Sequence, residues 1–428
     1  MFRDWYARRM FAWETRLMTR DENRVERPLE WGFEWIAPFL ESHGFGQAIP
    51  GPEAEHDNPA AEKAMVRINQ LLVRYSDIFF GYERPTDFRL EERFPQLFPT
   101  NVRPETLALD AELKQQAVDG NLARAQFLRF TSPERTPYPE NDLVNARWYP
   151  APAHKDPARP KQAIVVLPQW NADGFSHNSL CAIFNRFGVS ALRLSKPYHD
   201  IRRPTELERS DYAVSANIGR TISACRQAVV DIRCCIDWLE EQGYEQFGVL
   251  GTSLGSCYAY LASAHDPRIR VNAFNHASTA FGDVVWAGQS TRHIRQGLEE
   301  AGLTQNRLRD LWAAISPACY YDRFASLEAG GKDKKSMVVY ADYDLTFPRE
   351  FSLKIVETFR KHGLDFEVHV LPCGHYTTGE IPYKFIDGWH LGWFVYRAFK
   401  DLRREARSPK RLGAARTSEA VDGELASR

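Results

Sequence analysis

The chain has 428 residues, of which 43% are hydrophobic, and a formal net charge of −1. This length and hydrophobic content suffice for one sizeable core, and the balanced charge gives no electrostatic reason to expect a nucleic-acid partner. The seven cysteines form no C-x-x-C pair, and neither a metal-ligand spacing nor a phosphate-binding glycine loop occurs, so we expect no disulfide framework, metal or cofactor.

Residues 1–122 are expected to form a mainly helical N-terminal extension whose function cannot be read from the sequence. Helices are predicted near Met1–Arg20, Pro59–Ser76 and Glu105–Asn121. The apolar face of the first helix favours packing on the protein's own body, and a helix lying on a membrane surface is the alternative. The chain contains no secretory signal and no run of 18 apolar residues, so we expect a cytoplasmic location.

Beyond the extension, the pattern is typical of alternating strands and helices. Gln126–Thr131 and Leu143–Tyr149 are predicted as antiparallel strands joined by a proline-rich turn. The alternation that follows predicts a mostly parallel sheet covered by helices on both faces. Its strands are expected at residues 163–167, 189–194, 247–250, 271–275, 336–341 and 366–371, and its helices at 178–187, 222–242 and 349–362.

The pentapeptide Gly251-Thr252-Ser253-Leu254-Gly255 lies between a predicted strand and the helical stretch Cys257–His265. Strand, G-x-S-x-G and helix in this order form a nucleophile elbow, in which a sharp turn exposes the serine at the end of a parallel sheet. A serine hydroxyl needs a base to remove its proton and an acid to orient that base. Ser253 is therefore the candidate nucleophile, and the motif predicts an acid and a histidine downstream.

Both expected partners follow in the required order. Asp342 and Asp344 come after the strand at 336–341, and His375 comes after the strand at 366–371. Either aspartate has a second interpretation as a cap of the next helix. His369 lies within a strand and His390 in the last predicted helix, so both are expected to be structural.

The segment from Gln126 to Phe399 resembles the α/β-hydrolase superfamily, in which the nucleophile, acid and histidine match Ser253, Asp344 and His375. The family spacing of an acid, three residues and a proline favours Asp344 over Asp342. The stretch from Pro197 to Pro204, together with the elbow, is similar to the abhydrolase-domain-containing group numbered eighteen. The resemblance implies an α/β-hydrolase domain over residues 123–407, and no substrate is taken from it.

An acyl-transfer site also needs two backbone N–H donors for the oxyanion. One is expected from Leu254, the residue after the nucleophile, and the other from the loop after the strand at 163–167. Many relatives have His-Gly in that loop, whereas this chain has Pro168-Gln169-Trp170-Asn171. Proline cannot donate, so Gln169 is the candidate donor and Trp170 the alternative. Trp170, Asn171 and His177 are either site-lining residues or structural ones.

The stretch between the strands at 271–275 and 336–341 exceeds an ordinary connection. In the superfamily this is the usual position of a cap, and we expect a helical cap insertion at 279–335 with helices near 291–301 and 305–315. Its Phe281, Trp286 and Trp312 either form the wall of an acyl pocket or pack the insertion together. The tail at 408–428 is expected to be disordered.

Two arginines, Arg202 and Arg203, follow the strand at 189–194. They either bind an anionic group of the substrate or pair with neighbouring acidic residues, and the structural interpretation is preferred.

The predicted function is that of a serine hydrolase, carboxylesterase-like, which cleaves an ester or related acyl bond of a small molecule through an acyl-enzyme. A thioesterase, lipid deacylase or peptidase would use the same residues, and a non-catalytic hydrolase-like binding protein is the alternative from another class. The oligomeric state stays open.

Overall fold

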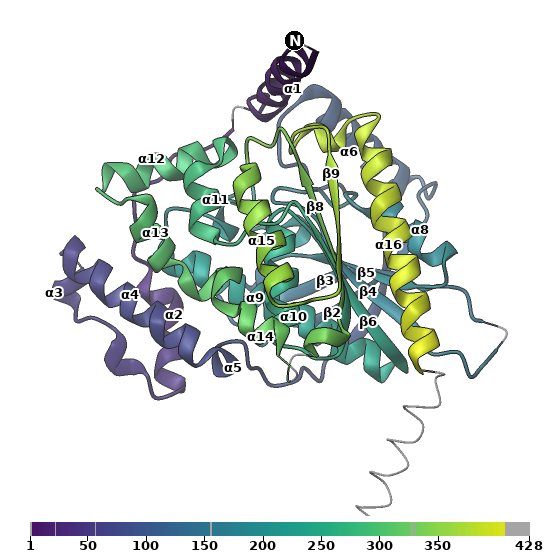
Figure 1. The fold of residues 1–428 in the computed structure, drawn as a ribbon, viewed down its shortest axis with the longest axis horizontal. Helices are drawn as coiled ribbons and strands as arrows, with labels where there is room; N and C mark the ends of the chain where they lie inside the picture. Colours follow the sequence, from purple (N-terminus) through teal and green to yellow (C-terminus); the bar gives the residue numbers. More distant parts are fainter. Residues whose placement is uncertain are drawn as a thin grey trace, which may run out of the picture.

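The computed structural model describes residues 2–21, 23–55, 57–154, 156–326, 328 and 330–406. In this part of the chain nine strands form one sheet, in the order β1-β2-β3-β5-β4-β6-β7-β8-β9 (Figure 1). The strands are β1 (Arg89–Arg93), β2 (Ala125–Thr131), β3 (Leu143–Tyr149), β4 (Lys161–Leu167), β5 (Ser190–Ser195), β6 (Tyr244–Thr252), β7 (Ile269–Asn275), β8 (Lys335–Ala341) and β9 (Phe366–Leu371).

The pairings β1–β2, β2–β3 and β3–β5 are antiparallel, and the pairings from β5 through β4 to β9 are parallel. Helices cover both faces, with α8 (Asn178–Arg186) and α16 (Tyr383–Ala406) on one side, and α9 (Ile218–Glu241), α10 (Leu254–Ala264) and α15 (Arg349–Lys361) on the other (Figure 1). The predicted α/β-hydrolase fold, with a mostly parallel and doubly covered sheet, is confirmed.

Residues 163–167 of β4 form a continuous apolar run because both faces of this strand are covered. Ala163 and Val165 belong to the hydrophobic cluster under α9 and α10, whereas Ile164 and Val166 belong to the cluster under α8 and α16. All four side chains are fully buried. Successive side chains of a strand point to opposite faces, so a strand covered on both sides needs apolar residues at every position.

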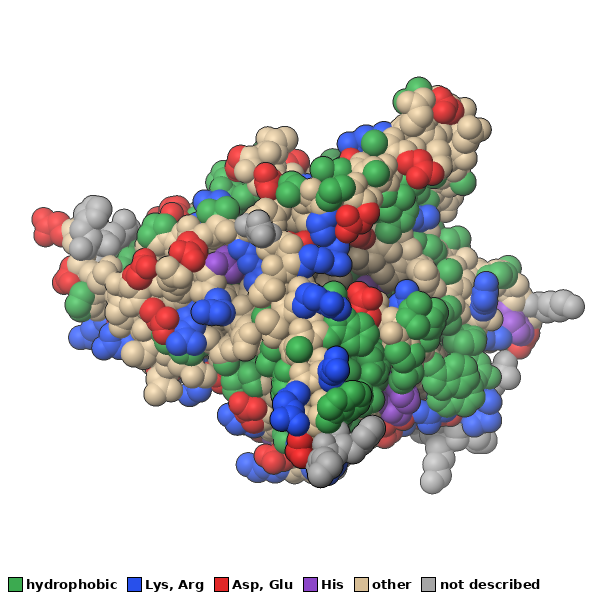
Figure 2. All heavy atoms as spheres, turned by 90° about the horizontal axis from the view of Figure 1, so that it is seen from above, with side chains coloured by type: hydrophobic (Ala, Val, Ile, Leu, Met, Phe, Trp, Pro, Cys, Tyr) green, Lys and Arg blue, Asp and Glu red, His purple; other side chains and the backbone are tan. Residues whose placement is uncertain are grey.

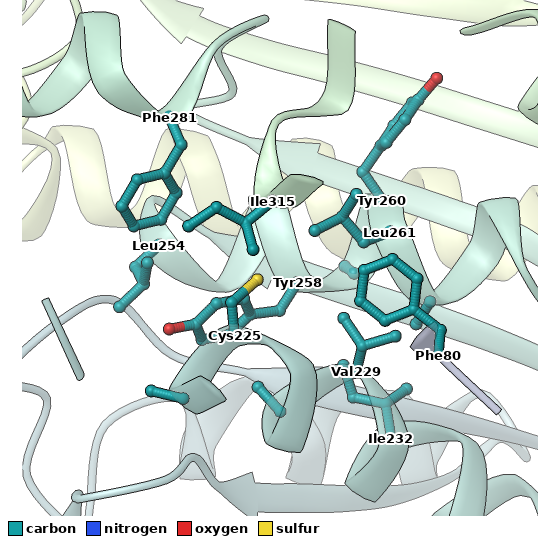
Figure 3. Close-up of a cluster of buried hydrophobic side chains, with 14 of the residues drawn as sticks. Phe80, Cys225, Val229, Ile232, Leu254, Tyr258, Tyr260, Leu261, Phe281 and Ile315 are labelled. Carbon is teal, nitrogen blue, oxygen red and sulfur yellow. The ribbon is translucent and has the colours of Figure 1, made fainter. Parts of the chain in front are cut away.

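The helices α9 and α10 pack against each other in the core beside the turn of Ser253. Figure 3 shows Cys225, Val229 and Ile232 of α9 facing Leu254, Tyr258 and Leu261 of α10, with Phe80, Phe281 and Ile315 in the same cluster.

The helix α9 begins at Ile218, four residues before its predicted start. The side chain of Asn217 caps it there by accepting a hydrogen bond of 2.8 Å from the N–H of Arg220.

The N-terminal segment contains the three predicted helices as α1 (Phe2–Met18), α4 (Asn58–Arg74) and α6 (Pro104–Val118). The sequence analysis missed α2 (Phe33–Ser42), which has Pro38 inside it, and the highly charged edge strand β1. Ile36, Leu40 and Met65 join the same core cluster as the sheet. The remaining short elements before the nucleophile are α3 (Pro52–Glu55), α5 (Ser76–Phe79), α7 (Pro139–Asp142), η1 (Gly46–Ala48), η2 (Asp200–Arg202) and η3 (Asp211–Ala213).

The stretch between β7 and β8 is helical, as expected. It contains α11 (Phe281–Ala287), η4 (Gln289–Thr291), α12 (Arg292–Glu300), α13 (Gln305–Leu311), η5 (Ala313–Ile315), η6 (Pro317–Tyr320), α14 (Tyr321–Ala325) and η7 (Gly331–Asp333). None of the helices in the described ranges has the length and apolarity to cross a membrane. The predicted disordered tail, 408–428, lies outside the described residues.

Candidate active site

Ser253 lies in the sharp turn between the end of β6 and the start of α10, with φ 57° and ψ −121°. Positive φ is strained for a residue with a side chain, and neighbouring glycines make the turn possible. A Cβ atom at Gly251 would collide with the carbonyl oxygen of Gly255, and one at Gly255 would collide with that of Leu167. The two glycines of the motif therefore allow α10 to begin directly against the end of β4.

The structure brings Ser253, Asp344 and His375 together at the carboxyl ends of three strands. Nε2 of His375 lies 3.0 Å from Oγ of Ser253, and its Nδ1 lies 2.9 Å from Oδ2 of Asp344. A carboxylate only accepts hydrogen bonds, so Nδ1–H donates to Asp344, and Nε2 is free to accept the proton of the serine hydroxyl. Chemically, such an arrangement can act as a nucleophile, a base and an acid that orients the base.

Asp344 is buried and accepts four hydrogen bonds. Its Oδ1 accepts from the N–H groups of Thr346 and Phe347, at 2.8 and 2.6 Å, and its Oδ2 from two histidines. Burial by itself would raise the pKa of this carboxyl group, but the His375 charge and the histidine hydrogen bonds hold the pKa well below its usual value. Asp344 is therefore ionised beside His375.

Asp342, the alternative acid, lies elsewhere. Its side chain is exposed, and its Oδ1 is 3.0 Å from Nε of Arg349 at the start of α15. The structure thus places Asp344, and not Asp342, beside His375.

His276 is a site residue that the sequence analysis missed. It follows β7 with φ 52°, is buried, and its Nδ1 lies 3.0 Å from the same Oδ2 of Asp344. The available signal was its position directly after a strand, because polar residues at the carboxyl ends of parallel strands meet at one edge of the sheet.

The expected oxyanion donors lie around the same cavity as Ser253. Leu254 is the first residue of α10, so its N–H has no acceptor within the helix. Gln169 and Trp170 also line the cavity. The loop that carries them is held by Lys196, which donates to the carbonyl oxygen of Gln169 at 3.0 Å, and by the indole N–H of Trp170, which donates to Ser210 at 3.0 Å. Both Gln169 and Trp170 stay candidates for the second donor.

Ser253 and His375 open into a cavity of about 1070 Å³. One wall is apolar and comes from α11, through Phe281, Val284 and Val285. Another wall is polar and includes Asn171, Thr252 and His177. Nε2 of His177 is 2.9 Å from Oγ1 of Thr252, and burial lowers the pKa of His177 to about 3, so this imidazole is neutral near pH 7. The cavity thus offers room for an apolar acyl group beside a neutral polar wall.

The outer part of the cavity is formed by α1 and α16. It is lined by Leu17 of α1 and Arg20 just after that helix, and by Phe385, Trp389 and Trp393 of α16. The three aromatic side chains are exposed, and Figure 2 shows hydrophobic side chains gathered beside a hollow on the face seen from above.

Among the three aromatic residues considered for the pocket wall, only Phe281 lines the cavity. Trp312 is fully buried and donates to the carbonyl oxygen of Ile218 in α9 at 3.3 Å. Trp286 is half-buried, with the guanidinium of Arg295 over its ring. Both tryptophans pack the insertion, and the expectation of a wall role for them is wrong.

The two arginines after β5 are structural. Arg202 is fully buried, with Nη1 2.8 Å from Oδ2 of Asp231 and Nε donating to the carbonyl oxygen of Asn141 at 2.7 Å. Arg203 donates to the backbone oxygens of Pro99 and Glu208, both at 2.8 Å. The alternative in which they hold a substrate anion is wrong. His369 and His390 stack on each other with ring centroids 4.1 Å apart, and neither of them lines the cavity.

In the described part of the chain, one group of potential metal ligands has its donor atoms close together, with all of them within 4.8 Å of one another. It consists of His276, Asp344 and His375, and so coincides with the hydrogen-bonded site. Both Nδ1 atoms already donate to Asp344.

No family model matches the sequence, and no curated protein is detectably similar to it. Several solved structures resemble the fold. The acetyl xylan esterase 1 from Thermoanaerobacterium sp. JW/SL YS485 is 12% identical, with a TM-score of 0.47 over 78% of this chain and 93% of that one. The esterase Pf2001 from Pyrococcus furiosus is 14% identical, with a TM-score of 0.41 over 64% and 90%. The acylaminoacyl peptidase from Pyrococcus horikoshii is 11% identical, with a TM-score of 0.43 over 60% and 43%.

The matched region spans less than half the length of that peptidase. At these identities and TM-scores, the similarities identify neither the substrate nor the reaction.

Proposed function

We propose that this chain is a serine hydrolase that cleaves a carboxylic ester or related acyl bond through an acyl-enzyme on Ser253. One observation carries the proposal: Ser253 Oγ, His375 and Asp344 form a continuous hydrogen-bonded chain, with distances of 3.0 and 2.9 Å, at the wall of a large cavity. The strained turn at Ser253 and the two glycines beside it support a role as nucleophile, because this backbone exposes the hydroxyl.

In the proposed reaction, Ser253 Oγ attacks the acyl carbon while Nε2 of His375 takes its proton. Asp344 stabilises the imidazolium that forms, and the N–H groups of Leu254 and Gln169 hold the oxyanion. The carbon–oxygen bond to the alcohol then breaks, and His375 returns the proton to the leaving oxygen. Water, activated by the same histidine, hydrolyses the acyl-enzyme and restores the free serine.

The apolar wall of the cavity favours an acyl group of considerable size. Its apolar wall on α11 matches a hydrocarbon chain, and the arginines after β5 are committed to structural contacts. Ester, thioester, lipid and peptide substrates would all use the same catalytic residues. The apolar wall therefore bears on the acyl group of the substrate and not on its leaving group. A non-catalytic binding protein is disfavoured, because it would have no need of the ordered hydrogen bonds from Ser253 to Asp344.

Several finer assignments belong to the same proposal. We propose a division into an extension at 1–122, a hydrolase domain at 123–407 and a cap insertion at 279–335. We also propose a small-molecule ester or acyl substrate and a cytoplasmic location. Membership of the abhydrolase-domain-containing group numbered eighteen is also part of the proposal. It rests on the elbow and on the stretch 197–204, in which the buried Arg202 binds Asp231.

Burst kinetics test the reaction class. An activated ester should release its alcohol in a rapid burst close to one equivalent of protein, followed by a slower steady state. Esters of one acid with different alcohols should share the same steady-state rate if deacylation limits it. Absence of any turnover across esters, thioesters and amides would contradict the proposal.

A further inference from the structure

The N-terminal helix α1 lies at the top of Figure 1. It packs on the loop that carries His375. The hydroxyl of Tyr6 donates a hydrogen bond to the carbonyl oxygen of Pro372. Phe11 packs edge to face on Tyr343 in the loop of the acid, with ring centroids 5.5 Å apart. Tyr6 and Pro372 are 366 residues apart in the sequence. A helix from the start of the chain therefore contacts the loops of both the base and the acid.

Glu14 of α1 is the contact closest to the base. Its side chain is completely buried, and its two oxygens accept hydrogen bonds from the N–H groups of Tyr376 and Thr377, at 2.8 and 2.9 Å. These are the two residues that follow His375. A buried carboxylate needs such partners, and loss of one side of the contact leaves unpaired buried groups.

The His375 loop has a shape that admits this carboxylate. A Cβ atom at Gly374 would collide with Oε2 of Glu14, so a glycine is needed at the position before His375. The N–H of Gly374 donates to Oγ1 of Thr377 at 2.6 Å, and its carbonyl oxygen accepts from Oγ1 of Thr378 at 2.8 Å. The backbone on both sides of His375 is thus fixed, and Glu14 is a central part of that arrangement.

The charges around His375 come from several elements. Burial opposes protonation of the ring, but Asp344 and then Glu14 raise the pKa of His375 above its ordinary value. Burial raises the pKa of Glu14, whereas its two backbone hydrogen bonds and His375 oppose that rise. Other titratable groups near the ring are His276 after β7 and Asp387 of α16, and Cys373 and Tyr376 lie in the loop itself. Those that face the loop from neighbouring elements are Tyr6, Tyr343, Tyr383, Asp21, Arg24 and Arg209.

We propose that Glu14 is a positioning residue for His375: it fixes the loop of the base through two backbone hydrogen bonds and stabilises the imidazolium that forms when Ser253 attacks. This inference rests on the proposed role of His375 as the general base. It gives the N-terminal extension a direct part in the reaction, although α1 supplies no group that touches the reacting atoms.

The rate of labelling by a fluorophosphonate, measured across pH, tests the proposal. Glu14→Gln preserves the volume of the side chain, removes the charge and replaces one acceptor oxygen by a donor. We expect the plateau rate to fall by roughly tenfold. The midpoint of the acid limb should move down by about 0.5 to 1 pH unit, because a neutral neighbour makes His375 easier to deprotonate.

Three further variants separate charge from structure. Glu14→Asp retains the charge but withdraws the carboxylate, so its plateau rate should fall while its midpoint stays at the wild-type pH. Tyr6→Phe weakens the docking of α1 without removing a charge, so its melting temperature should fall and its midpoint should stay unchanged. Glu41→Gln makes the same chemical change at an exposed site of α2 and should match the wild type in both measurements.

A wild-type plateau and midpoint in Glu14→Gln would overturn the proposal, even if the melting temperature fell, because Glu14 would then act on stability alone. If Glu14→Gln does not fold, Glu14→Asp decides, and a wild-type labelling rate in that variant would overturn the proposal. Ser253→Ala distinguishes the underlying function: labelling that persists in Ser253→Ala refutes the role of Ser253, whatever the Glu14 variants show.

Discussion

The imidazole rings of His276 and His375 lie with their centroids 4.6 Å apart, and both Nδ1 atoms donate to the same oxygen of Asp344. The acid is therefore held by a second histidine, His276, whose Nε2 is buried without a hydrogen-bond partner. The two histidines hold Oδ2 of the carboxylate, and the two backbone donors hold its Oδ1.

His276→Phe should preserve the ring but remove the donor. We expect kcat/KM to fall by roughly three- to tenfold and the free energy of unfolding by about 1 to 3 kcal/mol, because a charge-assisted hydrogen bond to a buried carboxylate is lost. Steady-state kinetics and chemical denaturation check both effects. A loss as large as that from removal of Asp344 would mean that His276 takes part in proton transfer.

The two aspartates after β8 should differ strongly. Asp344→Asn should slow acylation by on the order of a thousandfold or more, because an amide favours the wrong tautomer of His375. Asp342→Asn removes only an ion pair with Arg349 at the exposed start of α15 and should change the rate by less than about twofold. Single-turnover kinetics measure both, with circular dichroism as a check on folding. Equal losses would show that Asp342 also has a catalytic role.

The activity should decline at acid pH through protonation of His375. Only the neutral ring accepts a proton from Ser253, and Asp344 and Glu14 overcome burial to raise the pKa of His375 above 6.5. A raised pKa keeps the protonated form to higher pH, so kcat/KM should fall as pH drops through a midpoint above 6.5.

Asp387 provides the control for this profile, because burial raises its pKa to about 6 and it lies at the cavity. Asp387→Asn should leave the acid limb in place. An acid limb that disappears in this variant would assign the titration to Asp387.

The sequence predicted most of the fold, since long apolar strands and amphipathic helices alternate from Gln126 onward. It missed β1, whose charged sequence is tolerated because an edge strand has one exposed side. It also predicted the three residues that meet at the site, because the elbow and chain order constrain them locally.

The sequence did not reveal Glu14 or His276. Each acts through a contact between distant segments, and neither lies in a motif. Glu14 in an isolated helix is an ordinary polar residue, and only the tertiary structure shows that it is buried against the N–H groups of Tyr376 and Thr377. The prediction of Trp286 as a wall residue was wrong for the same reason. Trp286 and Val284 share the helix α11, yet of these two only Val284 lines the cavity.

Val284→Phe should therefore alter the acyl preference. The larger ring narrows the apolar wall, so the ratio of kcat/KM for long over short acyl chains should fall by roughly tenfold. Trp286→Ala, on the same helix, should leave that ratio unchanged and lower the melting temperature instead. A panel of esters that differ only in acyl length makes the comparison, and a changed ratio in Trp286→Ala alone would place the acyl site elsewhere.

The role of Ser253 is tested most directly by intact-protein and peptide mass spectrometry after exposure to a fluorophosphonate. The account predicts one added group, located on Ser253 in the wild type and absent from Ser253→Ala. That variant should fold normally and lose at least roughly a thousandfold in turnover. Labelling at another residue, or turnover near the wild-type level in Ser253→Ala, would contradict the account.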